Sequence, residues 1–320
     1  MPAITPRNSL TGIFCAVAAA VFFSLNDVSI KFLSGDYALY QVVLIRSLIG
    51  TLFLLAVVVP LEGGLRILRT RHPGKHLLRG SFVVLANMTF FLGLAALPLA
   101  DAVAIFFVSP LIITAFSVIF LGETVGRHRW AAVAVGMVGV LVMLRPGGGG
   151  FQPASLLPVA AAFGYAGLHM MTRRMGDTES AGAMTFYIQL MFIAVSLLMG
   201  LGFGDGRFSA QQDASLAFLL REWVWPDPGD LPIFVVIGLG SALGGWFISQ
   251  AYRLAEAGLA APFEYVAMPM AIFWGLAVFG EWPDRIAWIG IALIVGGGLY
   301  TLWREARLGR KLASDQPARR

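Results

Sequence analysis

Long apolar stretches follow one another along almost the whole chain. Ten of them are long enough to cross a bilayer, because a helix of about 20 mainly apolar residues covers a hydrocarbon core of about 30 Å. They lie at residues 10–33, 38–59, 78–97, 99–120, 127–144, 154–174, 181–203, 231–254, 257–279 and 285–303. Most are separated only by tight connections, so the pattern predicts an all-α membrane protein with ten transmembrane helices.

Composition excludes a soluble globule. The chain is 58% hydrophobic and 13% charged, with a mean hydropathy of +0.78, far from the balance of soluble domains. The first stretch is longer than the apolar region of a signal peptide and lacks a clear cleavage site, which predicts an uncleaved first span. The single cysteine, Cys15, lies inside this span, where we expect it to serve packing.

The placement of basic residues predicts the orientation in the membrane. If the N-terminus is cytoplasmic, 17 of the 23 Lys and Arg residues face the cytoplasm and five face the other side. The positive-inside rule therefore predicts that both termini are cytoplasmic. Because the net charge of +5 follows this pattern, it does not indicate nucleic-acid binding. The basic tail favours a topology signal, with binding of anionic lipid headgroups as the alternative.

The two halves of the chain repeat one another. Alignment of the first and sixth spans places Asp27 on His169, and alignment of the fourth and fifth spans with the ninth and tenth places Glu123 on Glu281. Each half holds five spans, an odd number, so the second half enters the membrane from the opposite side. The glycine run Gly147–Gly150 lies between the halves and lacks the Lys-Ser/Thr of a phosphate-binding loop, which favours a hinge.

A family resemblance rests on motifs that recur in both halves. A proline-bearing fourth span, FLGET and a W-x5-G-x2-G helix return as FGEWP and its following helix. This pattern resembles the EamA-type repeat of the drug/metabolite transporter superfamily. The resemblance implies two inverted five-helix repeats at 10–145 and 151–303, a basic cytoplasmic tail at 304–320, and a location in the bacterial inner membrane. Three segments, SLNDVSIKF, HLLRG and AAPFEY, are similar to S-adenosylmethionine uptake carriers.

Charged side chains inside the first two spans are candidates for a gate, because a charge in hydrocarbon needs a cavity or a partner. Asp27 lies about 17 residues into the first span and Arg46 about eight residues into the second, so both fall in the outer half of the bilayer. They can pair as a gate or an anchor, and Lys31 is a competing partner for Asp27 four residues further on. A static ion pair between neighbouring helices is an equally open alternative.

A second polar pair is predicted in the inner half of the bilayer. His169 lies about 15 residues into the sixth span, and Glu264 about seven residues into the ninth. An imidazole and a carboxylate at one depth could bind a cationic or zwitterionic substrate, or exchange a proton. The alternatives are a neutral His169 against neighbouring helices and a Glu264 that extends back toward the cytoplasm.

Prolines in corresponding spans point to a site near the bilayer midplane. Pro110, Pro262 and Pro269 remove amide donors and kink their helices, which frees carbonyl groups that need a cavity. Kinks that only shape helix contacts are the alternative. Ser109 and Tyr265 lie beside these positions. Buried amides and aromatic residues complete the candidate substrate-binding wall: Asn26, Asn87, Tyr165, Gln250 and Trp246.

Together these patterns predict a secondary transporter of a small organic metabolite that works by alternating access. The substrate would be S-adenosylmethionine-like or an amino acid, and protons stay open as a coupling ion. The alternatives are an amino-acid or drug exporter of the same family and a membrane-embedded enzyme or lipid-handling protein. The sequence has no H-E-x-x-H zinc motif, so we expect no catalytic residue, metal or cofactor. The pattern leaves the oligomeric state open.

Overall fold

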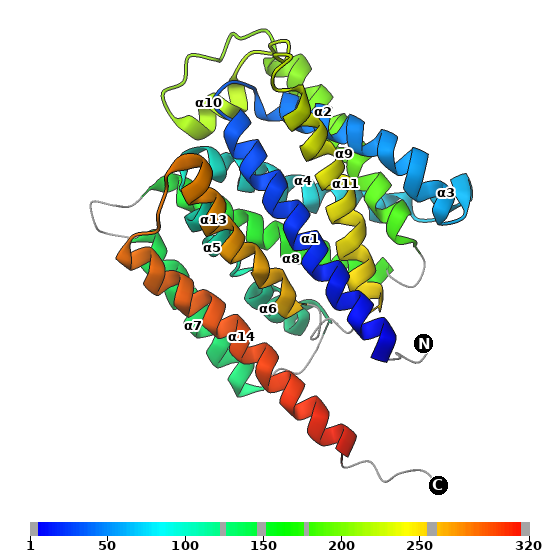
Figure 1. Ribbon diagram of the computed structural model, residues 1–320, viewed down its shortest axis with the longest axis vertical. Coiled ribbons are helices and arrows are strands. Elements are labelled where there is room, and N and C mark those ends of the chain that lie inside the picture. Colours follow the sequence, from blue (N-terminus) through cyan, green and yellow to red (C-terminus); the bar gives the residue numbers. More distant parts are fainter. Residues whose placement is uncertain (1–5, 122–125, 146–151, 176–178, 255–260, 315–320) are drawn as a thin grey trace.

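A computed structural model describes residues 6–121, 126–145, 152–175, 179–254 and 261–314. In this part of the chain every regular element is a helix (Figure 1). The α-helices are α1 (Pro6–Leu33), α2 (Leu39–Phe53), α3 (Val59–Leu61), α4 (Pro73–Ala96), α5 (Leu99–Phe106), α6 (Ser109–Leu121), α7 (Arg127–Leu144), α8 (Leu156–Met175), α9 (Ala181–Phe203), α10 (Ala214–Leu220), α11 (Leu231–Leu254), α13 (Ala267–Phe279) and α14 (Arg285–Ser314). A π-helical turn covers Leu54–Val58, and 3₁₀ helices cover Gly64–Leu68, Pro153–Ser155 and Ala261–Val266.

Seven helices in the described ranges are long and apolar enough to cross a membrane. The second of them combines α2, the π-helical turn and α3, and the fourth combines α5 and α6. Three shorter apolar helices, Trp130–Leu144, Glu264–Phe279 and Arg285–Tyr300, lie where the sequence predicts the fifth, ninth and tenth spans. The prediction of an all-helical, multi-pass membrane protein is confirmed.

Local sequence signals explain several helix ends. The Ser180 hydroxyl accepts a hydrogen bond from the Ala183 amide at 3.1 Å and caps α9, and Asp213 caps α10 in the same way. Pro73 occupies the first position of α4, where its missing amide costs nothing. Gly280 ends α13 with a φ of 66°, a conformation that favours glycine.

The fourth and ninth spans are not continuous α-helices. The fourth breaks at residues 107–108, and Pro110 is the second residue of α6. The ninth begins as a 3₁₀ helix, and Pro269 is the third residue of the α-helix that follows. Both prolines lie just after the interruptions. Proline has no amide hydrogen, so neither residue can donate to the carbonyl four residues earlier. Pro262 falls in the 3₁₀ stretch, but its side chain lies outside the described residues.

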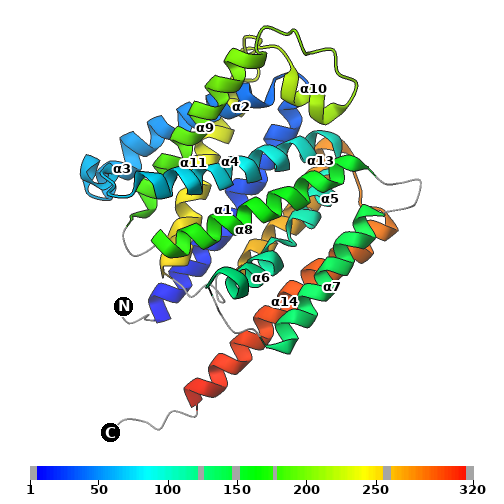
Figure 2. The same cartoon turned by 180° about the vertical axis from the view of Figure 1, so that it is seen from behind.

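Helices far apart in sequence pack in long pairs. Figures 1 and 2 show α1 along α11, α4 along α8, and α7 along α14 at one flank of the molecule. Helix α2 packs on both α9 and α11. The start of α1 and the end of α14 lie at the same end of the bundle, which we term the near end. The end of α1 and the start of α14 mark the far end.

Candidate functional site

A cavity of about 160 Å³ lies between helices from both halves of the chain. Helices α1, α2, α4 and α5 line it from the first half, and α8, α11, α13 and the preceding 3₁₀ helix line it from the second. Its ionisable and amide-bearing side chains are Asn26, Asp27, Arg46, Asn87, Tyr165 and Glu264. The fold thus brings together six of the residues that the sequence proposes.

Phenylalanine rings make up much of the remaining wall, and sequence reasoning missed most of them. Phe90 and Phe91 lie three and four residues after Asn87, and Phe23 lies four residues before Asp27. At these spacings the side chains share one helix face. The sequence therefore did contain a sign of this wall, since the phenylalanines share helix faces with polar residues. In a membrane span, however, a row of phenylalanines also looks like a face that contacts lipid.

Arg46 is the most deeply buried charge at the cavity. Its side chain is 2% exposed, and its guanidinium carbon lies 5.3 Å from the ring centre of Phe91 and 4.8 Å from that of Phe192. Such stacking on two rings stabilises the cation. The Nη1 atom lies 3.5 Å from Asn26 Oδ1, while Nε and Nη2 are buried without a hydrogen-bond partner among the described residues.

An amide bridges Asp27 and Arg46. Asn26 Nδ2 donates to Asp27 Oδ1 at 3.3 Å, and Asn26 Oδ1 faces the Arg46 guanidinium. Among the ion pairs of the described residues, none joins Asp27 directly to Arg46. The sequence suggested that the two charges could pair, with Lys31 as a competing partner. Residue spacing gives the depth of each charge but does not reveal the side chain between them.

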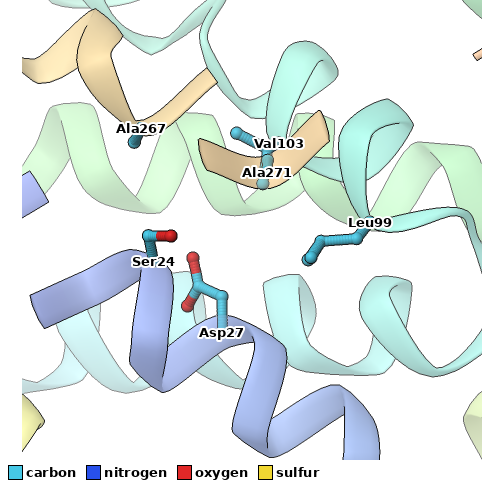
Figure 3. A pocket seen from close by; sticks show the side chains of 6 residues that line it. All are labelled: Ser24, Asp27, Leu99, Val103, Ala267 and Ala271. Carbon is cyan, nitrogen blue, oxygen red and sulfur yellow. The ribbon is translucent and has the colours of Figure 1, made fainter. Parts of the chain in front are cut away.

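Asp27 also faces a second, smaller hollow of about 10 Å³. Figure 3 shows the carboxylate of Asp27 and the hydroxyl of Ser24 pointing into it from α1. Its other walls are apolar and belong to α5 and α13: Leu99, Val103, Ala267 and Ala271. This volume suits about one water molecule. Asp27 therefore stands at the junction of the two spaces.

Two of the predicted site residues bind partners away from the cavity. Lys31 Nζ contacts Glu281 Oε1 at 2.7 Å and Oε2 at 3.0 Å, so Lys31 pairs with Glu281 and not with Asp27. Residue 281 lies 250 positions further along the chain, and helical spacing could not reveal this contact. Trp246 Nε1 donates to Glu62 Oε1 at 2.9 Å.

Four further candidates are not among the described residues that line the cavity. The ring of Tyr265 packs on Phe107 with centres 5.0 Å apart. The ring centres of His169 and Tyr165 lie 4.5 Å apart in an edge-to-face arrangement, so His169 lies one helical turn along α8 from a residue of the wall. Ser109 is buried, and Gln250 is half-buried on α11.

A polar cluster joins several helices at the far end of the bundle. In addition to Glu281, Lys31 Nζ donates to Leu97 O at 2.5 Å, and Glu281 Oε2 accepts from the Leu99 amide at 3.0 Å. We call these four residues the Lys31–Glu281 latch. It ties the end of α1 to the α4–α5 connection and to the segment between α13 and α14.

The loop at 204–230 is anchored on the same end. The hydroxyl of Tyr37 donates to Asp230 at 2.6 Å, and Arg221 Nη1 donates to Ser34 O at 3.0 Å. The side-chain amide of Gln41 donates to Val224 O. Burial and the neighbouring Asp230 raise the pKa of the Tyr37 hydroxyl. The loop is therefore fixed to the ends of α1 and α2.

A further ion pair at the far end joins the two halves. Arg145 Nη2 lies 2.5 Å from Asp284 Oδ2, and Asp284 Oδ1 also accepts from the Ala287 amide at 2.7 Å. Both contacts lower the pKa of the Asp284 carboxyl group. Elsewhere in the described ranges, no group of three or more His, Cys, Asp or Glu residues could hold a metal ion.

At the near end, Glu62 joins the halves. Besides Trp246 on α11, it accepts a hydrogen bond from the Gly182 amide at the start of α9 at 3.0 Å. Thr70 donates to Glu179 at 2.6 Å nearby. Both ends of the bundle thus carry polar contacts between the halves, with the cavity between them.

The chain is similar to proteins named as transporters over almost its whole length. The riboflavin transporter of Rhizobium johnstonii is 29% identical over 97% of each chain. The S-adenosylmethionine uptake transporter of Rickettsia conorii is 27% identical over 97% of this chain and 98% of its own. A solved structure, titled only as the crystal structure of a protein, has a TM-score of 0.65 at 22% identity and covers 94% of this chain and 98% of its own. Residues 10–145 and 152–303 each match the EamA-like transporter family, and the chain belongs to this family.

Proposed function

We propose that the chain is a secondary transporter that carries a small organic metabolite across the bacterial inner membrane by alternating access. The observation that carries the proposal is the central cavity, which draws its walls from both EamA repeats. A site between two repeats, beside interrupted helices, is typical of secondary transporters. We further propose that the near end, with both termini, faces the cytoplasm, as the basic residues predict.

The helix contacts support two five-span repeats inserted in opposite directions. In such repeats the first span (α1) corresponds to the sixth (α8), and the third (α4) corresponds to the eighth (α11). Exchange of the two repeats then converts the α1–α11 contact into the α8–α4 contact, and both contacts are present. The α2–α9 and α7–α14 pairs each exchange with themselves. A pseudo-twofold axis produces such a contact pattern, and the odd number of spans proposed for each repeat puts this axis in the membrane plane.

The cavity wall suits a flat ring system that bears polar groups. Phenylalanine faces bind aromatic rings by stacking or edge contacts, and Asn87, Asp27 and Glu264 offer hydrogen-bond and charge partners. Riboflavin and S-adenosylmethionine, for which the two relatives are named, both combine a heteroaromatic ring with polar substituents. We propose the same chemical class for this chain.

Alternating access requires one end to open while the other stays closed. At about 160 Å³ the cavity is smaller than the roughly 300–1,000 Å³ of pockets for drug-sized ligands, so a two-ring metabolite needs the helices to part. The Lys31–Glu281 latch closes the far end. The interruptions at residues 107–108 and before Ala267 lie at the cavity and are the proposed hinges.

Uptake into proteoliposomes tests the proposal. Purified protein is reconstituted, the vesicles are preloaded with unlabelled compound, and radiolabelled S-adenosylmethionine or riboflavin is added outside. We expect labelled compound to accumulate by counterflow faster than in protein-free vesicles. Counterflow of neither compound, nor of any aromatic metabolite in a wider screen, would contradict the proposed substrate class. Repetition with an imposed pH gradient shows whether protons are coupled.

A further inference from the structure

Arg46 lines the cavity, and its guanidinium group has two hydrogen-bond donors that no described residue uses. Its side chain is 2% exposed, and Nε and Nη2 are buried without a partner among the described residues. Burial of a cation with free donors is costly, because Nε and Nη2 have lost their hydration without gaining a hydrogen-bond acceptor. We propose that Arg46 is a substrate-binding residue whose Nε and Nη2 hold a carboxylate group of the transported metabolite. This inference rests on the proposed function and specifies its substrate.

The geometry of the free donors fits a carboxylate. Nε and Nη2 lie on one edge of the planar guanidinium group, and their two N–H bonds point the same way. This fork matches the two oxygens of a carboxylate, which it binds with two parallel hydrogen bonds. Phe91 and Phe192 flank the guanidinium group at 5.3 and 4.8 Å and fix its plane. The binding edge is therefore oriented before the ligand arrives.

Asp27 is the other group that could fill this fork, and Asn26 separates the two. The Asn26 side chain faces Arg46 Nη1 with its oxygen, at 3.5 Å, and Asp27 with its nitrogen, at 3.3 Å. The amide thus approaches the opposite side of the guanidinium group and leaves the Nε–Nη2 edge free. The carboxylate of Asp27 faces the small hollow beside Ser24 (Figure 3).

The rest of the cavity supplies the opposite charge. Asp27 and Glu264 line it together with Arg46. The formal charge of these three groups is negative, although Arg46 itself would bind an anion. A ligand that complements all three groups carries a carboxylate, at least one cationic group and an aromatic ring for the phenylalanines. S-adenosylmethionine and aromatic amino acids have these features. A neutral flavin would leave the fork empty, so the structure assigns a zwitterionic substrate class.

Matched pairs of ligands that differ in the carboxylate test this assignment. The pairs are S-adenosylmethionine with its decarboxylated form and tryptophan with tryptamine, and riboflavin is the neutral aromatic probe. Binding is measured from ligand-dependent thermal unfolding of the purified full-length protein. In the wild type we expect the carboxylate member of a pair to bind about 10- to 100-fold more tightly. In Arg46→Met that ratio should fall toward one, and Arg46→Lys should restore it only in part.

Arg79→Met is the matched control. Arg79 is also a buried arginine in a membrane span, at 5% exposure, but it donates to Thr172 at 2.9 Å and to Met184 O at 3.2 Å. It is not among the described residues that line the cavity. Its loss should lower stability and leave the carboxylate ratio unchanged. If Arg46→Met does not fold, the ratio of the two ligand affinities in the wild type and in Arg46→Lys still tests the assignment.

Three outcomes overturn the inference. The first is a carboxylate-free ligand that binds the wild type as tightly as its partner, and the second is an undiminished ratio in Arg46→Met. The third is binding and transport of riboflavin alone, in which case the proposed transport function stands and only the carboxylate site fails. If no probe binds and none is transported, the proposed substrate class fails together with the site.

Discussion

At the scale of single residues, the charges in the membrane spans have separate partners. Lys31 and Asp27 lie one helical turn apart on α1, yet Lys31 bonds to Glu281 at the far end while Asp27 faces the cavity. Arg46 lies between two aromatic rings. One helix thus contributes to closing the bundle and to lining the cavity, two roles that alternating access requires to be linked.

Weakening of the latch is expected to open the far end. Glu281→Gln removes the anion opposite Lys31, and a charged hydrogen bond contributes about 1.5–3 kcal/mol, so the open population should rise about 10- to 100-fold. Cys15 is the only cysteine, so Cys15→Ser with Ser241→Cys gives one thiol in the cavity wall. A membrane-impermeant thiol reagent added from the far end should label it faster.

Asp284→Asn is the control for this experiment. It breaks the exposed contact with Arg145 at the same end of the bundle without a change to the latch. Labelling of Ser241→Cys should stay at the background rate in this variant. Equal labelling rates in Glu281→Gln and the unmutated background would show that the latch does not control access.

At the scale of helices, close backbone contact defines the α7–α14 pair. A Cβ atom at Gly139 would lie 2.8 Å from Ile294 Cγ1, 2.9 Å from Leu293 Cβ and 3.0 Å from Gly290 O. Small residues permit such approaches in membranes, where helix association depends on tight van der Waals contact. The pair lies at one flank of the bundle (Figure 2). A change in this contact therefore acts mainly on these two helices.

Gly139→Ala should therefore destabilise the protein. The added methyl group forces the helices apart at a cost of about 1–3 kcal/mol, more than the roughly 1 kcal/mol that alanine gains over glycine within a helix. Gly296→Ala on α14 is the matched control, because nothing lies within 4 Å of its Cβ position. Thermal unfolding in detergent should show a lower midpoint for Gly139→Ala alone, and equal midpoints would contradict the close crossing.

At the scale of the whole molecule, the two repeats build one cavity that neither could enclose alone. The start of α1 and the end of α14 share the near end, as any even number of alternating spans requires. The loop at 204–230 is anchored at the far end through Tyr37 and Ser34. The arrangement therefore gives each compartment a defined set of loops.

Reporter fusions can check the proposed orientation. An alkaline phosphatase reporter, active only outside the cytoplasm, should be inactive after residue 314 and active within the loop at 204–230. A green fluorescent reporter should give the reverse result. Opposite compartments for the two termini would contradict both the ten-span topology and the inverted repeats, since an odd number of spans would then separate them.

The sequence by itself determined the solvent, the helical class and the family. Apolar runs of spanning length leave few alternatives, because an unsatisfied backbone group in lipid costs several kcal/mol and helices satisfy these groups within one segment. Duplicated motifs such as Gly-Glu after the fourth and ninth spans identify the repeat. Because a charged side chain is costly to bury in the membrane, the sequence also indicated Asp27, Arg46 and Glu264 as functional candidates. All three line the cavity.

Only the tertiary structure decided which side chains meet. Helical spacing suggested Lys31 as a partner for Asp27, but Lys31 pairs with Glu281, which lies 250 residues further along the chain. It suggested cavity roles for Tyr265 and Trp246, which instead pack on Phe107 and donate to Glu62. The reason is physical: burial depth is a property of one helix and can be read along it, whereas contacts depend on how neighbouring helices rotate and cross, which long-range packing alone fixes.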